Sequence, residues 1–174
     1  MENFPSLKKP SHLITTFFGV GLLPLAPGTW GSLSGLLMFY LFIFFEISFE
    51  IFTLIFLLFT IVSIITCEIA TMDLTVKDQK SIIVDEISGL WVSFLFLPLL
   101  DLYDFSNSEW QEGTFLATFI LFLSFRFFDI LKPHPISFID RNLKTGFGIV
   151  LDDLVAGVFA GLCLLGGNFF INIF

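Results

Sequence analysis

The stretch IFTLIFLLFTIVSIITC, residues 51–67, contains no charged residue and consists mostly of large apolar side chains. A straight helix needs about 20 residues, with a range of roughly 17–25, to cross the hydrocarbon part of a bilayer. Residues 51–67 reach this length as they stand, and residues 154–174 do so as well. Both stretches therefore predict membrane-spanning helices.

Three further apolar stretches occur at 33–45, 87–100 and 114–125. Each is shorter than a span and qualifies only with flanking residues or as a short helix packed against its neighbours. Only 14% of the 174 residues are charged, whereas soluble domains carry about 25%. We therefore expect a single all-α domain over residues 1–174, a compact multi-pass membrane protein with four or five spanning helices and short loops.

Apart from Glu68, the charged residues occur in five islands, at 1–12, 46–50, 70–86, 101–113 and 126–153. All eight Lys and Arg residues lie in the first, third and fifth islands, whereas the second and fourth hold only acids. Short loops rich in Lys and Arg remain in the cytoplasm. Five spans with a cytoplasmic N-terminus satisfy this alternation without exception.

The remaining composition narrows the possible functions. A net charge of −8 argues against nucleic-acid binding, which needs a clustered excess of Lys and Arg. Cys67 and Cys163 lie far apart in apolar stretches, which indicates two free thiols. His12 and His134 match no ligand spacing, and no obligatory protein partner is indicated.

The N-terminal region favours a surface or re-entrant helix over residues 13–31 rather than a signal peptide, because Gly19, Gly21 and Pro24 interrupt its apolar run. The loop 24–32 is expected to precede a helix from Leu33. Its glycines could offer backbone N–H groups to an anion. The alternative is an ordinary helix entry capped by Thr29 or Ser32.

Acidic residues recur beside the cytoplasmic ends of the predicted spans. Ionised groups at the edge of hydrocarbon are costly, so they normally have a partner or a function. Oxygen ligands suit Mg²⁺ or Mn²⁺, and a divalent cation would relieve the repulsion between converging carboxylates. The alternative is helix capping, which accounts for one acid of each adjacent pair but not for the second. The acids concerned are Glu68, Asp85, Glu86, Asp129, Asp152 and Asp153.

Arg126, Asp129 and Lys132 are spaced i, i+3, i+6 and therefore share one face of a predicted helix. Pro133 is expected to end this helix. Two cations and an acid could grip a phosphate and bind a metal. The alternative is an internal salt bridge with a snorkelling Arg/Lys pair. A weak internal repeat also relates residues 84–89 to 151–157, since each has an acidic pair followed by a glycine one turn later.

Four blocks together resemble the phosphatidylglycerophosphatase A family: GLLPLAPGTWGSL (21–33), KDQKSIIVDEISGLW (77–91), FRFFDILKPHPISFIDR (125–141) and GFGIVLDDLVAGV (146–158). The resemblance implies a magnesium-dependent lipid phosphatase of the bacterial inner membrane. It would hydrolyse the terminal phosphate of phosphatidylglycerophosphate, a lipid in the bilayer, at a site facing the cytoplasm. The matching polar residues are Thr29, Glu68, Asp78, Asp85, Glu86, Arg126, Asp129, Lys132, Asp140, Arg141, Asp152 and Asp153.

Chemistry assigns roles within this set. Asp85, Glu86, Asp129, Asp152 and Asp153 are the expected catalytic residues, and with Glu68 they are the expected ligands of one or two Mg²⁺ ions. Thr29, Arg126, Lys132 and Arg141 are the expected phosphate contacts. Either direct attack by water or an aspartyl-phosphate intermediate is compatible with this set. An ion-coupled transporter and a non-catalytic scaffold subunit are the alternative functions.

Overall fold

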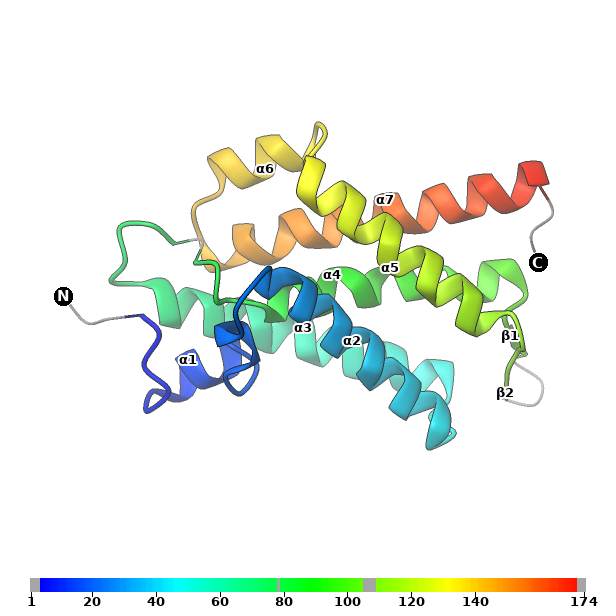
Figure 1. Ribbon diagram of the computed structural model, residues 1–174, viewed down its shortest axis with the longest axis horizontal. Helices are drawn as coiled ribbons and strands as arrows, with labels where there is room; N and C mark the ends of the chain where they lie inside the picture. Colours follow the sequence, from blue (N-terminus) through cyan, green and yellow to red (C-terminus); the bar gives the residue numbers. More distant parts are fainter. Residues whose placement is uncertain (1–3, 78, 105–108, 172–174) are drawn as a thin grey trace.

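A computed structural model of the protein describes residues 4–77, 79–104 and 109–171. This part of the chain is almost entirely helical, with one antiparallel pair of two-residue strands (Figure 1). The elements are, in order, α1 (Pro10–Thr15), η1 (Val20–Leu22), α2 (Pro27–Phe44), α3 (Phe49–Thr71), α4 (Val84–Phe94), η2 (Leu97–Leu100), β1 (Tyr103–Asp104), β2 (Glu109–Trp110), α5 (Thr114–Leu131), α6 (Ile136–Asn142) and α7 (Gly146–Ile171).

Four helices of the described residues, α2, α3, α5 and α7, are long and apolar enough to cross a membrane. Their outward surfaces carry exposed apolar side chains such as Leu58 and Leu123, as lipid-facing helices require. The predicted multi-pass helical membrane fold is therefore confirmed. In α7, 56% of the membrane-spanning residues are buried, against 28% in each of the other three, so α7 is the most enclosed of the four.

The fifth apolar stretch, 87–100, forms the short helix α4 followed by the 3₁₀ turn η2. Because α4 has 11 residues, it rises only about 16 Å, which is half of a typical hydrocarbon core. All of its residues except Glu86 and Val92 are buried. It runs through the middle of the bundle, packed against α2, α3, α5 and α7 (Figure 1).

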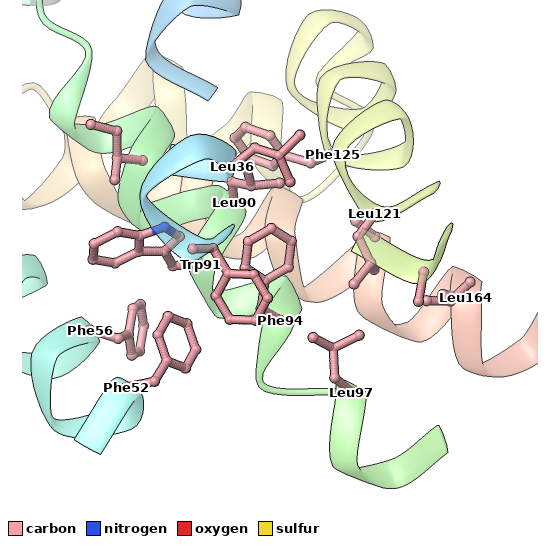
Figure 2. Packing of buried hydrophobic residues seen from close by; sticks show 14 of the residues in the cluster. Leu36, Phe52, Phe56, Leu90, Trp91, Phe94, Leu97, Leu121, Phe125 and Leu164 are labelled. Atoms are coloured by element: carbon pink, nitrogen blue, oxygen red, sulfur yellow. The ribbon is translucent and has the colours of Figure 1, made fainter. Parts of the chain in front are cut away.

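Aromatic packing holds α4 in this central position (Figure 2). Trp91 is fully buried, and its Nε1 donates a hydrogen bond to the backbone oxygen of Gly35 on α2 at 2.8 Å. Phe39 of α2 lies 4.5 Å from the ring of Phe94 and 4.9 Å from that of Phe52 on α3. Such aromatic pairs contribute about 0.5–1.5 kcal/mol each beyond burial, so this cluster ties three helices together.

Two glycines bring α4 and α7 into backbone contact. A Cβ atom on Gly157 of α7 would overlap the backbone oxygen of Gly89 on α4. A Cβ atom on Gly89 would lie 2.7 Å from the backbone oxygen of Asp153. These are the glycines of the two repeated segments, 84–89 and 151–157, so the two segments of the internal repeat pack against one another.

The N-terminal region differs from the prediction. Helix α2 begins at Pro27 rather than Leu33, because Pro occupies its first turn and Ala26 supplies the backbone carbonyl that accepts from Thr29 and Trp30. The N-cap residue is therefore Ala26, and no side chain caps the helix. Thr29 and Ser32 lie within α2 instead of capping it, so only residues 24–26 of the predicted loop 24–32 precede the helix. The expected surface helix is limited to α1.

The charged islands sort to the two ends of the molecule as predicted. Lys77 and Lys132, from the third and fifth islands, line one cavity. At the opposite end, Tyr103 donates its hydroxyl to Glu50 at 3.3 Å, which joins the fourth island to the second. Figure 1 shows α1 and α6 near one end of the bundle and the β1–β2 pair at the other.

Candidate active site

A cavity of about 190 Å³ lies at the end of the bundle that holds the lysines of the third and fifth charged islands. It is enclosed by the loop preceding α4, the starts of α4 and α7, the end of α5, and α6. Six acids and four lysines line it, so its wall is polar and carries an excess of negative charge. These charged residues are Lys77, Lys80, Asp85, Glu86, Asp129, Lys132, Asp140, Lys144, Asp152 and Asp153.

Helices α4 and α7 supply the two acidic pairs. Asp85 and Glu86 lie in the first turn of α4, one turn before Gly89, and Asp152 and Asp153 lie one turn before Gly157. The contact between these glycines therefore brings the pairs together. Asp153 is 4% exposed and lies within electrostatic range of Asp85, Glu86, Asp129 and Asp152. The five carboxylates, which come from three helices, thus line one cavity.

Capping the helix start explains only one of these four acids. The N-cap residue of α4 is Ile83, whose side chain makes no cap hydrogen bond, but Asp85 Oδ1 accepts from the backbone N–H of Glu86 at 3.1 Å in the first turn. Helix α7 begins at Gly146, so Asp152 and Asp153 lie inside the helix rather than at the predicted helix start near Leu154. Because the first orphan N–H groups of a helix lie within its first four residues, neither acid of α7 can cap it.

Lys132 joins three elements at the cavity. It ends α5 in the left-handed conformation (φ 43°), and its Nζ donates to Asp152 Oδ2 at 2.7 Å and to Asp140 Oδ1 at 3.0 Å. Burial alone would lower the pKa of Lys132, but the carboxylates of Asp152 and Asp140 outweigh burial and raise its pKa above the usual value. Lys132 is therefore a permanently charged group in the cavity wall.

Arg126 lies behind the cavity rather than on its surface. Its Nη1 forms an ion pair with Asp129 Oδ2 at 2.8 Å, lies 3.9 Å from Glu86 Oε1, and donates to Ser32 Oγ at 3.3 Å. Its side chain is 14% exposed. Arg126 and Asp129, which were predicted to share one helix face, thus form an ion pair. Arg126 also contacts α2 through Ser32 and α4 through Glu86.

The glycines of α2 form a niche for Glu86. A Cβ atom on either Gly28 or Gly31 would overlap a carboxylate oxygen of Glu86. The sequence predicted that these glycines expose backbone groups to an anion, and the anionic group beside them is a side chain of the protein itself.

Four predicted site residues do not line the cavity: Arg126, which lies behind it, and Thr29, Glu68 and Arg141. Thr29 is exposed on the first turn of α2, and Arg141 is exposed on α6. Glu68 accepts a hydrogen bond from the backbone N–H of Gly146 and lies 3.6 Å from Lys77, so it stabilises the start of α7. The structure therefore separates the predicted metal ligand Glu68 and the predicted phosphate contacts Thr29, Arg126 and Arg141 from the cavity.

Three lysines of the cavity, Lys77, Lys80 and Lys144, were not predicted as site residues. Within the described part of the chain, the ammonium group of Lys80 forms no ion pair, whereas Lys144 donates to the backbone oxygen of Asp140. Lys77 and Lys80 belong to the KDQK segment (77–80), which is part of one of the four family blocks, so the sequence could have indicated them. Asp78, within that segment, lies outside the described residues.

The donor set is chemically suited to a hard divalent cation, because carboxylate oxygens are the ligands that Mg²⁺ prefers. Among the residues that the structure describes, no three Asp, Glu, His or Cys side chains form a ready-made metal site. Lys132 engages Asp152 and Arg126 engages Asp129. A cation bound here would have to draw carboxylates away from these ion pairs.

Comparison with known proteins gives a consistent family. The profile of the family described as Phosphatidylglycerophosphatase A matches residues 13–168. A protein of that name from Haemophilus influenzae is 39% identical over 91% of this chain and 91% of its own length. One of the same name from Escherichia coli is 35% identical over 93% of this chain and 86% of its own.

A protein named putative phosphatidylinositol-3-phosphatase, from Bacteroides thetaiotaomicron, is 32% identical over 88% of this chain and 92% of its own length. No solved structure matches the chain. The profile covers most of the sequence and all four quoted blocks. The chain belongs to the phosphatidylglycerophosphatase A family.

Proposed function

We propose that the protein hydrolyses the terminal phosphate of phosphatidylglycerophosphate, in a reaction that depends on Mg²⁺, at the cytoplasmic face of a bacterial inner membrane. Its family makes it a phosphatase that acts on a phosphomonoester. The transporter alternative has no support among these relatives. The products would be phosphatidylglycerol and inorganic phosphate.

The observation that carries this proposal is the placement of two acidic pairs beside Lys132 in one cavity at an end of a membrane-embedded bundle. A lipid substrate keeps its acyl chains in the bilayer, so only its headgroup has to reach such a cavity. Carboxylates for a cation and ammonium groups for a phosphate are the two classes of group that phosphoryl transfer needs.

The residues of the cavity would have two roles, phosphate binding and cation binding. Lys132 and Lys80 would attract the phosphate and offset the charge that spreads over its oxygens in the transition state. Asp85, Asp152 and Asp153, with Glu86 and Asp129, would hold the cation. When bound, this cation would polarise the phosphoryl oxygens and lower the pKa of a water molecule.

The reaction itself is a displacement at phosphorus. A water oxygen forms a bond to phosphorus, and the bond between phosphorus and the glycerol oxygen breaks. A carboxylate of the cavity would accept the proton of the water and return a proton to the leaving oxygen. Burial of Asp85 and Asp153, which are 8% and 4% exposed, would keep bulk water away from these groups.

The position of the lysines supports the proposed orientation. The cavity lies at the end that holds Lys77, Lys80, Lys132 and Lys144, and Lys-rich ends of membrane proteins remain in the cytoplasm. An inner-membrane enzyme with this orientation would meet a lipid phosphate made on the cytoplasmic leaflet.

The decisive experiment is release of inorganic phosphate from phosphatidylglycerophosphate in vesicles by the purified protein. We expect release with Mg²⁺ and loss of release when EDTA is added, with recovery on excess Mg²⁺. Phosphate release that is unaffected by EDTA would exclude the cation from the reaction. Absence of release in every condition, by protein that retains its helical content, would contradict the proposed substrate.

A further inference from the structure

A layer of residues behind the cavity joins α2 to the carboxylates of α4 and α5. It consists of Ser32, Arg126 and the two glycines Gly28 and Gly31. We propose that Ser32 and Arg126 are positioning residues, which hold the carboxylates of Glu86 and Asp129 in place for the cavity. This inference rests on the proposed function for its role in catalysis, but its geometry is independent of the substrate.

The guanidinium group of Arg126 is the centre of this layer. Its Nη1 contacts Ser32 of α2, Glu86 of α4 and Asp129 of α5, so one atom links three helices. Glu86 and Asp129 both line the cavity, whereas Arg126 does not. Arg126 therefore has its closest charged contacts with the carboxylates rather than with the space that a substrate would occupy.

Ser32 anchors this guanidinium group on the side away from the acids. Its side chain is fully buried, its hydroxyl donates to the backbone oxygen of Gly28 at 3.0 Å, and its Oγ accepts from Arg126. The Nε of Arg126 is buried and makes no hydrogen bond among the described residues. Loss of the Ser32 acceptor would therefore leave the buried guanidinium group less satisfied and freer to shift.

Gly28 and Gly31 limit where the Glu86 carboxylate can lie. A Cβ atom at either position would overlap it, and a Cβ atom on Gly28 would also lie 3.0 Å from Arg126 Nη1. Helix α2 thus contacts Glu86 through its backbone and contacts Arg126 through Ser32. The short spacing of Gly28, Gly31 and Ser32 puts both contacts on one face of the first turns of the helix.

Fixed carboxylates matter because the acids of this cavity repel one another. Asp153 lies within electrostatic range of both Glu86 and Asp129. With Arg126 in place, the two outer acids are drawn toward α2 and α5, and their charge is partly offset. If Arg126 moves, the same acids rotate into other conformers, and the arrangement that binds a cation is populated less often.

Ser32→Ala tests this role, and Ser34→Ala is its matched control. Both serines lie on α2 and donate their hydroxyls to the carbonyl oxygen four residues earlier, at 3.0 Å and 2.8 Å, but only Ser32 contacts Arg126. The variants are combined with Arg126→Lys in a double-mutant cycle. The measurements are kcat and KM for phosphatidylglycerophosphate, the melting temperature, and direct binding of Mn²⁺ by electron paramagnetic resonance.

We expect Ser32→Ala to lower kcat about tenfold, the size of one lost hydrogen bond to a charged group, with little change in KM and weaker Mn²⁺ binding. Its melting temperature should fall somewhat below that of Ser34→Ala, because the buried guanidinium group loses an acceptor, but the protein should remain folded at the assay temperature. In the Arg126→Lys background, Ser32→Ala should have little further effect, because it acts through Arg126. Additive losses would instead show that Ser32 acts independently of Arg126 and would overturn the inference.

The two proposals fail in different ways. If the wild-type protein releases phosphate and Ser32→Ala equals Ser34→Ala in kcat and in Mn²⁺ binding, the positioning role is wrong and the proposed function stands. If the wild-type protein releases no phosphate, Mn²⁺ binding alone decides. Weaker binding in Ser32→Ala than in Ser34→Ala then supports the positioning role, and equal or absent binding overturns it.

Discussion

Asp153 lies in the second turn of α7, and only 4% of its side chain is exposed, in a helix that is otherwise apolar enough to span a membrane. A carboxylate at such a position is expensive unless it has a function or a partner. Its carboxylate lies within electrostatic range of four others, those of Asp85, Glu86, Asp129 and Asp152. A bound cation would offset the repulsion that Asp153 meets in this cavity.

Asp153→Asn should abolish phosphate release, by at least a hundredfold, because the amide keeps the size of the side chain but cannot serve as an anionic ligand. The melting temperature should not fall, since the substitution removes charge repulsion. Asp101→Asn, at the opposite end of the molecule, is the control and should be fully active. Wild-type turnover in Asp153→Asn would remove this residue from the reaction.

Lys132→Met should destabilise the protein, because it leaves Asp152 buried without its ammonium partner at 2.7 Å. Allowing for the 28% exposure of the Lys132 side chain, we expect a loss of roughly 2 kcal/mol. Thermal unfolding in detergent measures this, with the exposed Lys8→Met as control. An equal stability of the two variants would contradict a structural role for the ion pair.

The pH dependence of this ion pair follows from the pKa of Lys132. Its pKa in the folded protein is raised above the unfolded value of 10.5, so its contribution to stability is complete below that value and is lost only as pH rises through the folded pKa. The difference in melting temperature between wild-type protein and Lys132→Met should therefore be constant between about pH 6 and 9. A decline within this range would indicate that Lys132 loses its proton more easily.

At the scale of elements, the site depends on how closely α4 and α7 approach. Each helix carries its acids one turn before a glycine, and Gly89 and Gly157 form the contact. The close approach is what allows acids from two helices to share one cavity. Small residues at helix contacts are a common means of packing in membranes, where burial of apolar surface gives little drive for association.

Gly157→Ala should separate these helices, because the new methyl group would overlap the backbone oxygen of Gly89, which cannot move without shifting α4. Overpacking of this kind costs about 1–3 kcal/mol. We expect a lower melting temperature and a loss of activity larger than the loss of folded protein. Gly166→Ala lies on the same helix with no atom within 4 Å of the new Cβ, and it should change neither quantity.

At the scale of the whole molecule, charge separates the two ends. The cavity end carries Lys77, Lys80, Lys132 and Lys144, whereas the other end joins Glu50 to Tyr103 and the backbone of Ile47 to Trp110. Buried α4 with η2 also runs between the ends, so the chain passes five times from one end to the other although four helices have the length of a span (Figure 1).

Cysteine labelling tests this orientation. In a background with Cys67 and Cys163 replaced by Ser, we expect a membrane-impermeant maleimide added outside intact spheroplasts to label Glu112→Cys and not Lys80→Cys. Disruption of the membrane should expose both. The reverse pattern would put the cavity on the outer side and would contradict the positive-inside argument.

The sequence alone predicts the class of fold and the end of the molecule that carries the chemistry. A long apolar stretch such as 51–67 is stable only in the hydrocarbon part of a bilayer. The alternation of Lys and Arg between islands can be read from their positions in the sequence. The four blocks also indicate the family. These properties need no knowledge of how the helices pack, which is why Asp85, Glu86, Asp129, Asp152, Asp153 and Lys132 could all be placed at one cavity.

Only the tertiary structure shows which residues line that cavity and which residues lie behind it. Thr29, Glu68 and Arg141 were predicted from the sequence as site residues, but packing places them outside the cavity. The start of α2 at Pro27 and the burial of α4 depend on contacts with distant segments, such as Glu86 beside Gly28 and Trp91 bonded to Gly35. Local patterns of hydropathy carry little information about such contacts, because the long helices α2, α3, α5 and α7 are apolar on most of their faces.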